Sequence, residues 1–96
     1  MRDSATSATL TVNVVYLARL REAFGSSGEV MPLSAPGDGA TVADILATLA
    51  ARGGIWAAEL AAGRAVRVAV NYVMCARETP VRAGDEIALF PPVTGG

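Results

Sequence analysis

Residues 86–96 read EIALFPPVTGG, an apolar run that passes into two prolines and a final pair of glycines. Side chains alternate between the two faces of a strand, so a strand over residues 86–90 has Ile87 and Leu89 on one face. Ala88 and Phe90 lie on the other face. We therefore predict that this segment is the last strand of a sheet and that it carries apolar side chains on both faces.

The six residues that follow this strand have the chemistry of an extended tail. Proline fixes φ and favours an extended residue before it, so Pro91 and Pro92 direct the chain away from the sheet. Gly95 and Gly96 have no side chains, so a narrow slot in a partner protein can close on their backbone. The carboxylate of Gly96 can then reach a reactive centre. We predict that residues 91–96 form a flexible tail bound by a partner.

A second apolar strand is predicted near the start of the chain, where residues 10–17 read LTVNVVYL. The residues assigned to the core face are Leu10, Val12, Val14 and Tyr16. Val15 and Leu17 lie on the opposite face and are also apolar. This second face is therefore expected to be covered by a partner.

The clearest helix begins at Thr41. Thr41 can cap the helix, and Asp44 stands three residues on, where a capping box has an acidic or amide side chain. The apolar stripe at helical spacing comprises Val42, Ile45, Leu46, Leu49 and Ala50. We expect Gly53 and Gly54 to end this helix.

The remaining segments are shorter. Helical turns are predicted over residues 18–24 and 55–60, strands over 29–33, 66–70 and 73–76, a loop over 34–40, and turns at Pro80 and Gly84. Pro32 places the strand over 29–33 at a sheet edge. The first and last strands are the most apolar and should be adjacent at the centre. Together these features predict an α+β domain over residues 10–90, with helices on one side of a mixed sheet, after a disordered arm over residues 1–9.

Composition excludes several classes of function. The chain has 96 residues, a net charge of −1, no lysine and no histidine, which removes Schiff-base chemistry and histidine-based catalysis or metal binding. The arginines are scattered, so no nucleic-acid partner is expected. We expect neither a membrane segment nor a signal peptide, and therefore a cytoplasmic protein.

Other candidate sites are weak. Cys75 is the single cysteine, so it forms no internal disulfide or CxxC site, and packing is favoured over a catalytic role. The glycine-rich stretches match no phosphate-binding loop, and the Asp85–Glu86 pair has no further ligand near it in sequence. We predict no metal site.

The chain resembles the small subunit of molybdopterin synthase, a ubiquitin-like sulfur carrier with the β-grasp fold. The match is closest over residues 84–96, GDEIALFPPVTGG, and continues in Val70-Asn71, Pro80, Thr41-Val42 and residues 18–22. It covers residues 10–96. The resemblance implies a mixed sheet of about five strands packed on one main helix.

The resemblance also implies a mechanism. An E1-like partner uses ATP and Mg²⁺ to adenylate the carboxylate of Gly96, and sulfur from a persulfide converts it to a thiocarboxylate. The large subunit of molybdopterin synthase, with which a heterotetramer is expected, then receives the tail. The residues implied to thread into it are Pro91, Pro92, Val93, Thr94 and Gly95. Sulfur passes to cyclic pyranopterin monophosphate during molybdenum cofactor synthesis, and this chain itself binds no cofactor.

A docking patch is implied by the same resemblance. Its apolar positions are Leu17, Met74 and Phe90, and Arg21 matches a family arginine that can pair with a partner carboxylate. Met74 and Cys75 differ from the aliphatic residues of the family. Alternatives are a carrier for thiamine, cysteine or RNA thiolation, a ubiquitin-like modifier, or a binding module with an inert tail.

Overall fold

The computed structural model describes residues 8–35, 39–61 and 66–91. The helices and strands in these ranges are β1 (Ala8–Tyr16), α1 (Arg19–Phe24), β2 (Gly28–Ala35), β3 (Ala40–Thr41), α2 (Val42–Ala50), α3 (Gly54–Glu59), β4 (Arg67–Val70), β5 (Val73–Met74), β6 (Pro80–Val81) and β7 (Glu86–Phe90). Residues 1–7 and 92–96 lie outside the described part, so the predicted arm is described only from Ala8 and the predicted tail only at Pro91.

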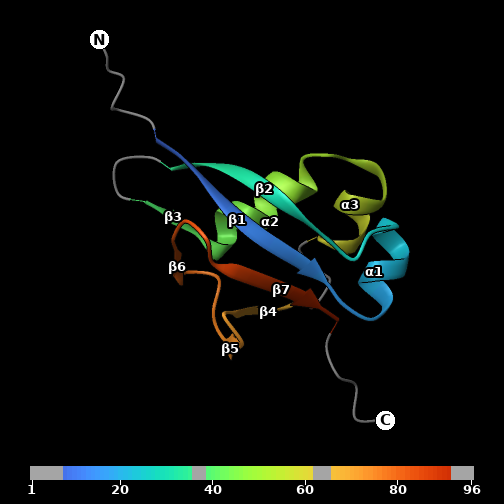
Figure 1. Ribbon diagram of the computed structural model, residues 1–96. Helices are drawn as coiled ribbons and strands as arrows, with labels where there is room; N and C mark the ends of the chain where they lie inside the picture. The colour runs from blue at the N-terminus through green and yellow to red at the C-terminus, as the bar shows by residue number, and fades with distance from the viewer. Residues whose placement is uncertain (1–7, 36–38, 62–65, 92–96) are drawn as a thin grey trace.

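Five strands form a mixed sheet in the order β2-β1-β7-β4-β5 (Figure 1). β1 and β7 are parallel neighbours, and the other neighbouring strands are antiparallel. The first and last strands are therefore adjacent at the centre of the sheet, as predicted. Tyr16 pairs with Leu89, so β7 ends beside the point where β1 passes toward α1.

β1 has the alternation that the sequence predicts. Val12, Val14 and Tyr16 are buried, and Leu10 packs partly buried against the same core. The strand begins at Ala8, two residues before the predicted start, because Ala8 still pairs with Ala35 of β2.

β2 is an edge strand, as the proline in it predicts. The Tyr16 N–H donates to the Ser27 carbonyl at 3.0 Å, and antiparallel pairing alternates, so Glu29 and Met31 face β1 with their backbone groups. Pro32 falls between two such positions. The N–H that proline lacks would therefore have pointed to the free edge, where its loss costs no sheet hydrogen bond.

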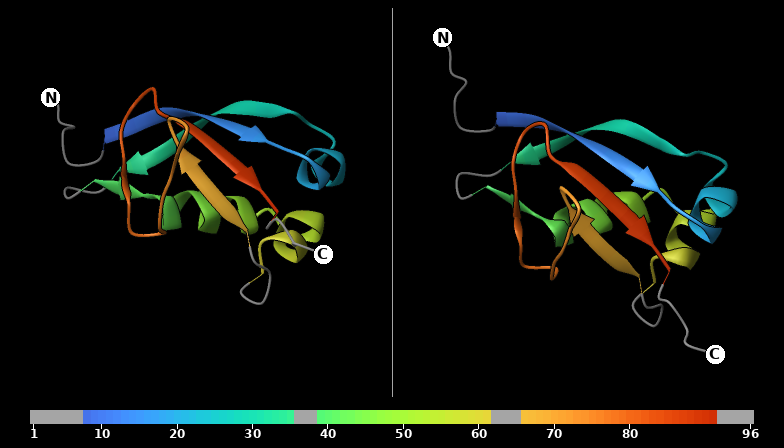
Figure 2. Two further views of the ribbon diagram at one scale, coloured as in Figure 1. Left: turned by 90° about the horizontal axis from the view of Figure 1, so that it is seen from below. Right: turned by 60° about the horizontal axis from the view of Figure 1, so that its bottom comes forward.

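α2 covers one face of the sheet, as Figure 2 shows with the sheet seen along its edge. The Thr41 N–H donates to the Asp44 carboxylate at 2.8 Å, which confirms the predicted cap. Two further N–H groups at the helix start, those of Val42 and Ala43, donate to the carbonyls of Thr79 and Arg77. The hydrophobic core between α2 and the sheet includes Val42, Ile45, Leu46, Leu49, Val12, Val14, Tyr16, Met31, Ile87 and Leu89.

Two local predictions are wrong. Gly53 and Gly54 do not end α2, which stops at Ala50; they begin α3, and both have positive φ, 79° and 55°, which glycine adopts without strain. The segment expected as a loop over 34–40 is shorter, because β2 extends to Ala35 and β3 begins at Ala40. β3 pairs with β6 in a separate two-stranded sheet, at the position where only a turn was predicted.

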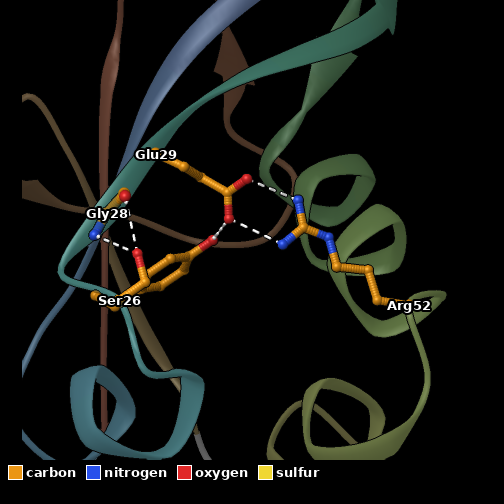
Figure 3. A network of polar contacts seen from close by, with 5 residues as sticks. Ser26, Gly28, Glu29 and Arg52 are labelled. Atoms are coloured by element: carbon orange, nitrogen blue, oxygen red, sulfur yellow. Dashed lines mark hydrogen bonds and ion pairs between the residues drawn. The ribbon is translucent and has the colours of Figure 1, made fainter.

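A network of polar contacts closes the open side of the core (Figure 3). The Glu29 carboxylate accepts a hydrogen bond from the Tyr16 hydroxyl at 2.6 Å and two from the Arg52 guanidinium at 2.8 and 2.9 Å. Arg52 also lies over the Trp56 ring, 4.5 Å from its centroid, and Trp56 stacks on Phe24. The network joins β1 and β2 to the turn between α2 and α3, and Trp56 packs against the core beside it.

Acid should weaken this network. Hydrogen bonds from Arg52 lower the pKa of the Glu29 carboxyl, while burial and the Glu29 carboxylate raise the pKa of Tyr16. A carboxyl with a lowered folded-state pKa stabilises the fold above its unfolded pKa and loses that contribution as the pH falls. Glu29→Gln should therefore lower the free energy of unfolding by about 1 kcal/mol near neutral pH.

Denaturant unfolding of wild type and Glu29→Gln across pH measures this effect. The difference between them should shrink below about pH 4, where the wild-type carboxyl also becomes neutral. Glu78→Gln is the control, because the exposed Glu78 side chain has no hydrogen bond or ion pair with any described residue. A pH-independent difference for Glu29→Gln would contradict the expectation.

A buried acid anchors α3 to α1. Glu59 is 6% exposed, and its carboxylate accepts a hydrogen bond from the Arg19 guanidinium at 2.8 Å. A buried carboxylate is costly unless a charged partner compensates it, so this pair fixes the two short helices relative to each other.

None of the helices within the described ranges is long and apolar enough to cross a membrane.

The β4–β5 hairpin turns through two residues with positive φ, Asn71 at 49° and Tyr72 at 73°. Two-residue hairpin turns favour this geometry, with asparagine first and glycine second. Asn71 fits, since its side chain donates to Asp85 and accepts from the Glu86 N–H, both at 3.0 Å. Tyr72 does not fit, because a residue with a Cβ atom is strained at this positive φ, where the turn favours glycine. Its side chain is 84% exposed and its hydroxyl donates to the Glu86 carboxylate at a long 3.4 Å, so little compensates the strain.

Tyr72→Gly should therefore raise the free energy of unfolding by about 1 kcal/mol, because it relieves the strained backbone. Asn71→Gly is the matched comparison. It relieves the same kind of strain but removes two side-chain hydrogen bonds, so it should lower stability. Thermal unfolding of both variants gives the answer, and a destabilised Tyr72→Gly would contradict the strain argument.

Candidate functional site

The predicted site is built on the end of β7. Ile87 and Leu89 are fully buried against the core, while Ala88 and Phe90 are partly buried on the face away from the helices. Pro91 follows directly and is the last described residue. The tail positions predicted to react or to thread into a partner, Pro92, Val93, Thr94, Gly95 and Gly96, lie outside the described residues.

The sheet face away from α2, called the outer face below, brings the three predicted apolar docking positions together. Leu17 follows the Tyr16–Leu89 pair, so it lies beside Phe90, and its N–H donates to the Leu89 carbonyl at 3.0 Å. Met74 pairs with Ala69, which pairs in turn with Ala88. Met74 is therefore two strands, about 10 Å, from β7 on the same face.

These apolar side chains are accessible. Leu17 is 41% and Met74 51% exposed. Neighbouring exposed apolar side chains on one face are typical of a protein interaction surface. The predicted docking role of Leu17, Met74 and Phe90 fits this arrangement and stays a prediction.

The backbone at Ala18 fixes the corner of this face. Ala18 has a φ of 54°, which is uncommon for a residue with a Cβ atom, and the chain turns here from β1 into α1. The Leu17 carbonyl accepts the Leu20 N–H at 3.1 Å. The Leu17 N–H is thus bonded to β7 and the Leu17 carbonyl to α1, so its side chain is held at the sheet end where β7 stops.

Arg21 lies on α1, the helix that follows this corner. Its side chain is exposed and makes no hydrogen bond or ion pair with the described residues. Its predicted pairing with a partner carboxylate stays a prediction.

Cys75 follows β5 at the edge of the sheet, opposite the core residue Val68. It is partly buried, packs against the core and has its Sγ 3.6 Å from the Val68 carbonyl. Among the described residues, no group of three histidine, cysteine, aspartate or glutamate side chains is placed to hold a metal ion.

Sequence reasoning missed Arg67, which pairs with Phe90 across β4 and β7. Its side chain therefore belongs to the outer face, next to a predicted docking residue. The alternation of Val66, Arg67 and Val68 shows that Arg67 faces away from Val68, but only the register of β4 against β7 shows which residue it meets.

Comparison with known proteins gives the family. Residues 14–96 match the model of the ThiS family. The chain is 40% identical over 85 residues to the molybdopterin synthase sulfur carrier subunit of Haemophilus influenzae, and the aligned region covers 88% of this chain and 99% of that protein. It is 34% identical over 85 residues to the protein of the same name from Escherichia coli K12, with the same coverage.

Solved structures agree on the fold. The solution structure of the Haloferax volcanii HVO 2177 protein has a TM-score of 0.76 at 28% identity, covering all of this chain and 93% of that one. The putative molybdopterin converting factor subunit 1 from Pyrococcus furiosus has a TM-score of 0.70 at 26% identity, with 88% and 99% covered. SAMP1 from Haloferax volcanii has a TM-score of 0.67 at 29% identity, with 90% and 99% covered.

The predicted α+β fold is thus confirmed as the ubiquitin-like β-grasp, a mixed five-stranded sheet packed on the main helix α2. The chain therefore belongs to the ThiS family, in the superfamily that includes the molybdopterin synthase sulfur carrier subunits.

Proposed function

We propose that this chain is the sulfur carrier subunit of a molybdopterin synthase, and that the carboxylate of Gly96 is its reacting group. The observation that carries the proposal is the 40% identity to a protein of that name over 99% of that protein's length. The geometry supports it, because the central strand β7 runs directly into Pro91 beside the exposed Leu17.

Activation takes place in an E1-like partner, which binds ATP and Mg²⁺. A carboxylate is a poor electrophile, so its oxygen first attacks the α-phosphate of ATP, forming the Gly96 acyl-adenylate and releasing pyrophosphate. A persulfide sulfur then attacks the acyl carbon, and AMP leaves. A second thiol cleaves the resulting acyl disulfide at its S–S bond, which leaves the thiocarboxylate on Gly96 and a disulfide on the thiol partners.

Delivery uses this chain's own residues. Leu17, Met74 and Phe90 dock on the large synthase subunit, and Pro91–Pro92 directs Val93–Gly95 into its active site. The thiocarboxylate sulfur attacks a side-chain carbon of the precursor pterin, and a C–O bond at that carbon breaks as its oxygen leaves. Water then hydrolyses the resulting thioester, which leaves the sulfur on the pterin and the carboxylate on Gly96. Two such transfers build the dithiolene. We place these steps in the cytoplasm, where ATP is available.

One other function has a specific observation in its favour. SAMP1, the small archaeal modifier protein 1 of Haloferax volcanii, has a similar fold. A modifier would join its Gly96 carboxyl group to a lysine ε-amino group of another protein. This chain then forms an isopeptide bond in place of a released thiocarboxylate.

The test is sulfur transfer in a reconstituted synthase. Thiocarboxylated chain, the cognate large subunit and cyclic pyranopterin monophosphate should yield a dithiolene product, measured by chromatography, while unmodified chain should yield none. Transfer to a thiazole-forming synthase with no transfer to the pterin would assign the chain to thiamine synthesis. Isopeptide-linked conjugates without any pterin product would favour the modifier.

A further inference from the structure

An open groove of about 450 Å³ lies at the β4–β5 edge of the sheet, lined by residues 66–68 and 74–77. β5 has only two residues, which pair with Ala69 and Val70, so the first half of β4 has no strand beside it on the side away from β7. The Cys75 N–H still donates to the Val68 carbonyl at 3.1 Å. Beyond Cys75 the chain leaves the sheet.

The far wall is held in place by α2. The carbonyls of Arg77 and Thr79 accept the N–H groups of Ala43 and Val42, at 2.9 and 3.0 Å. Arg77 therefore lines the groove with its side chain while its carbonyl accepts a hydrogen bond from the start of α2. The groove is a fixed consequence of the fold, because its two walls are tied to β4 and to α2.

The lining combines an apolar floor with two free cations. Val68 is buried, Val66 and Cys75 are partly buried, and all three present apolar surface beside the exposed Met74. The side chains of Arg67 and Arg77 are exposed and make no hydrogen bond or ion pair with the described residues.

Two other arginines of the fold, Arg19 and Arg52, are paired with acids. Each bonds a carboxylate at 2.8 Å. Two guanidinium groups that meet no internal acid and share a groove with apolar side chains are complementary to an acidic group carried on an apolar segment.

The groove is continuous with the outer face. Met74 belongs to both, and Arg67 pairs with Phe90, the last residue before Pro91. A partner that covers Phe90 therefore lies against Arg67. Because Arg67 lines the groove together with Met74 and Arg77, the same partner can extend into the groove.

We propose that this groove binds a partner segment in which a carboxylate is flanked by apolar side chains, with the carboxylate held by Arg67 and Arg77. That the partner is the large synthase subunit rests on the proposed function. Two cations over an apolar floor match such a segment, whereas a nucleic-acid backbone requires a longer row of positive charge.

The first test uses ¹⁵N-labelled full chain and two blocked hexapeptides, one with two glutamates among leucines and valines and the other with glutamines in their place. The acidic peptide should shift the amide signals of residues 66–68 and 74–77 in a saturable way, with a dissociation constant of about 1 mM or below. The glutamine peptide should bind at least about fivefold more weakly.

The matched variants locate the charge effect. R67Q/R77Q should bind the acidic peptide about as weakly as the glutamine peptide binds wild type, with an otherwise unchanged amide spectrum. Arg82→Gln, which changes an exposed arginine outside the groove, should bind like wild type. Equal binding of the two peptides, equal binding by R67Q/R77Q, or no saturable shift in the groove would overturn the proposal.

The second test uses the cognate large subunit. Its affinity for R67Q/R77Q should fall about tenfold, and for Arg82→Gln it should not change. Unchanged affinity for R67Q/R77Q would overturn the assignment of that partner. The peptide test needs neither an activating enzyme nor the large subunit, so a failure of the groove and a failure of the proposed sulfur carrier function give different results.

Discussion

A chain extended by one alanine after Gly96 should acquire no thiocarboxylate, a loss of at least about 100-fold relative to the unextended chain. The extension moves the terminal carboxylate one residue beyond the position that the two glycines present, and it adds a side chain where a narrow slot must close. Misplacing a reacting group by about 1 Å is enough for a loss of this size. Mass spectrometry of the reaction with ATP, the activating enzyme and a sulfur donor measures the effect.

The control carries the same alanine ahead of Met1. β1 is parallel to β7, so it begins at the sheet end opposite to the one where β7 reaches Pro91. This variant should load sulfur at the wild-type rate. Normal loading of the chain extended after Gly96 would contradict the proposal that Gly96 is the reacting residue, and would favour a binding module whose tail is inert.

Two adjacent residues of β7 should have opposite effects on stability and docking. Leu89 is fully buried beside Tyr16 and Val68, so Leu89→Ala should lower the free energy of unfolding by about 3 kcal/mol. Phe90 is partly buried on the outer face, so Phe90→Ala should cost about 1 kcal/mol or less. The affinity of Phe90→Ala for the large subunit should nevertheless fall at least about tenfold, because apolar anchors dominate such interfaces.

Denaturant unfolding and calorimetric titration of both variants separate these effects. Leu89→Ala that is still folded should bind the large subunit nearly as wild type does, since its side chain does not reach the outer face. Tight binding by Phe90→Ala would remove Phe90 from the docking surface. A loss of stability in Phe90→Ala as large as that in Leu89→Ala would show that the ring belongs to the core.

Strong local patterns made much of the fold predictable. The alternation in β1 identified its buried face, that in β7 separated Ile87 and Leu89 from Ala88 and Phe90, and Thr41 with Asp44 located the start of α2. Pro32 marked the sheet edge. In each case a short-range physical rule, alternation, capping or the missing N–H of proline, agrees with the tertiary structure.

Contacts between distant segments could not be read from such rules. Glu29 meets Arg52 across 23 positions, and Arg19 meets Glu59 across 40. β3 and β6 have two residues each, too few to carry a period, so their pairing depends on the tertiary fold. Gly53 and Gly54 fit the end of one helix and the start of the next equally well by sequence.

The site shows the same division. Leu17 and Phe90 could be assigned because each follows a recognisable strand, and the structure places them side by side. Arg67 could not be assigned to the site, because its position beside Phe90 depends on the β4–β7 register. The groove between β4 and residues 75–77 depends on where the chain leaves a two-residue strand, which no sequence pattern encodes.

The most direct test of the central claim is the mass of the C-terminal tryptic peptide after reaction with ATP, the activating enzyme and a sulfur donor. Cleavage after Arg82 releases residues 83–96, which contain neither methionine nor cysteine, so oxidation at those residues cannot imitate a sulfur gain. We predict that one sulfur replaces one oxygen at Gly96 and that the product reacts with a thiol alkylator. An unchanged peptide, with an enzyme shown to load the Haemophilus influenzae relative, would contradict the proposed function.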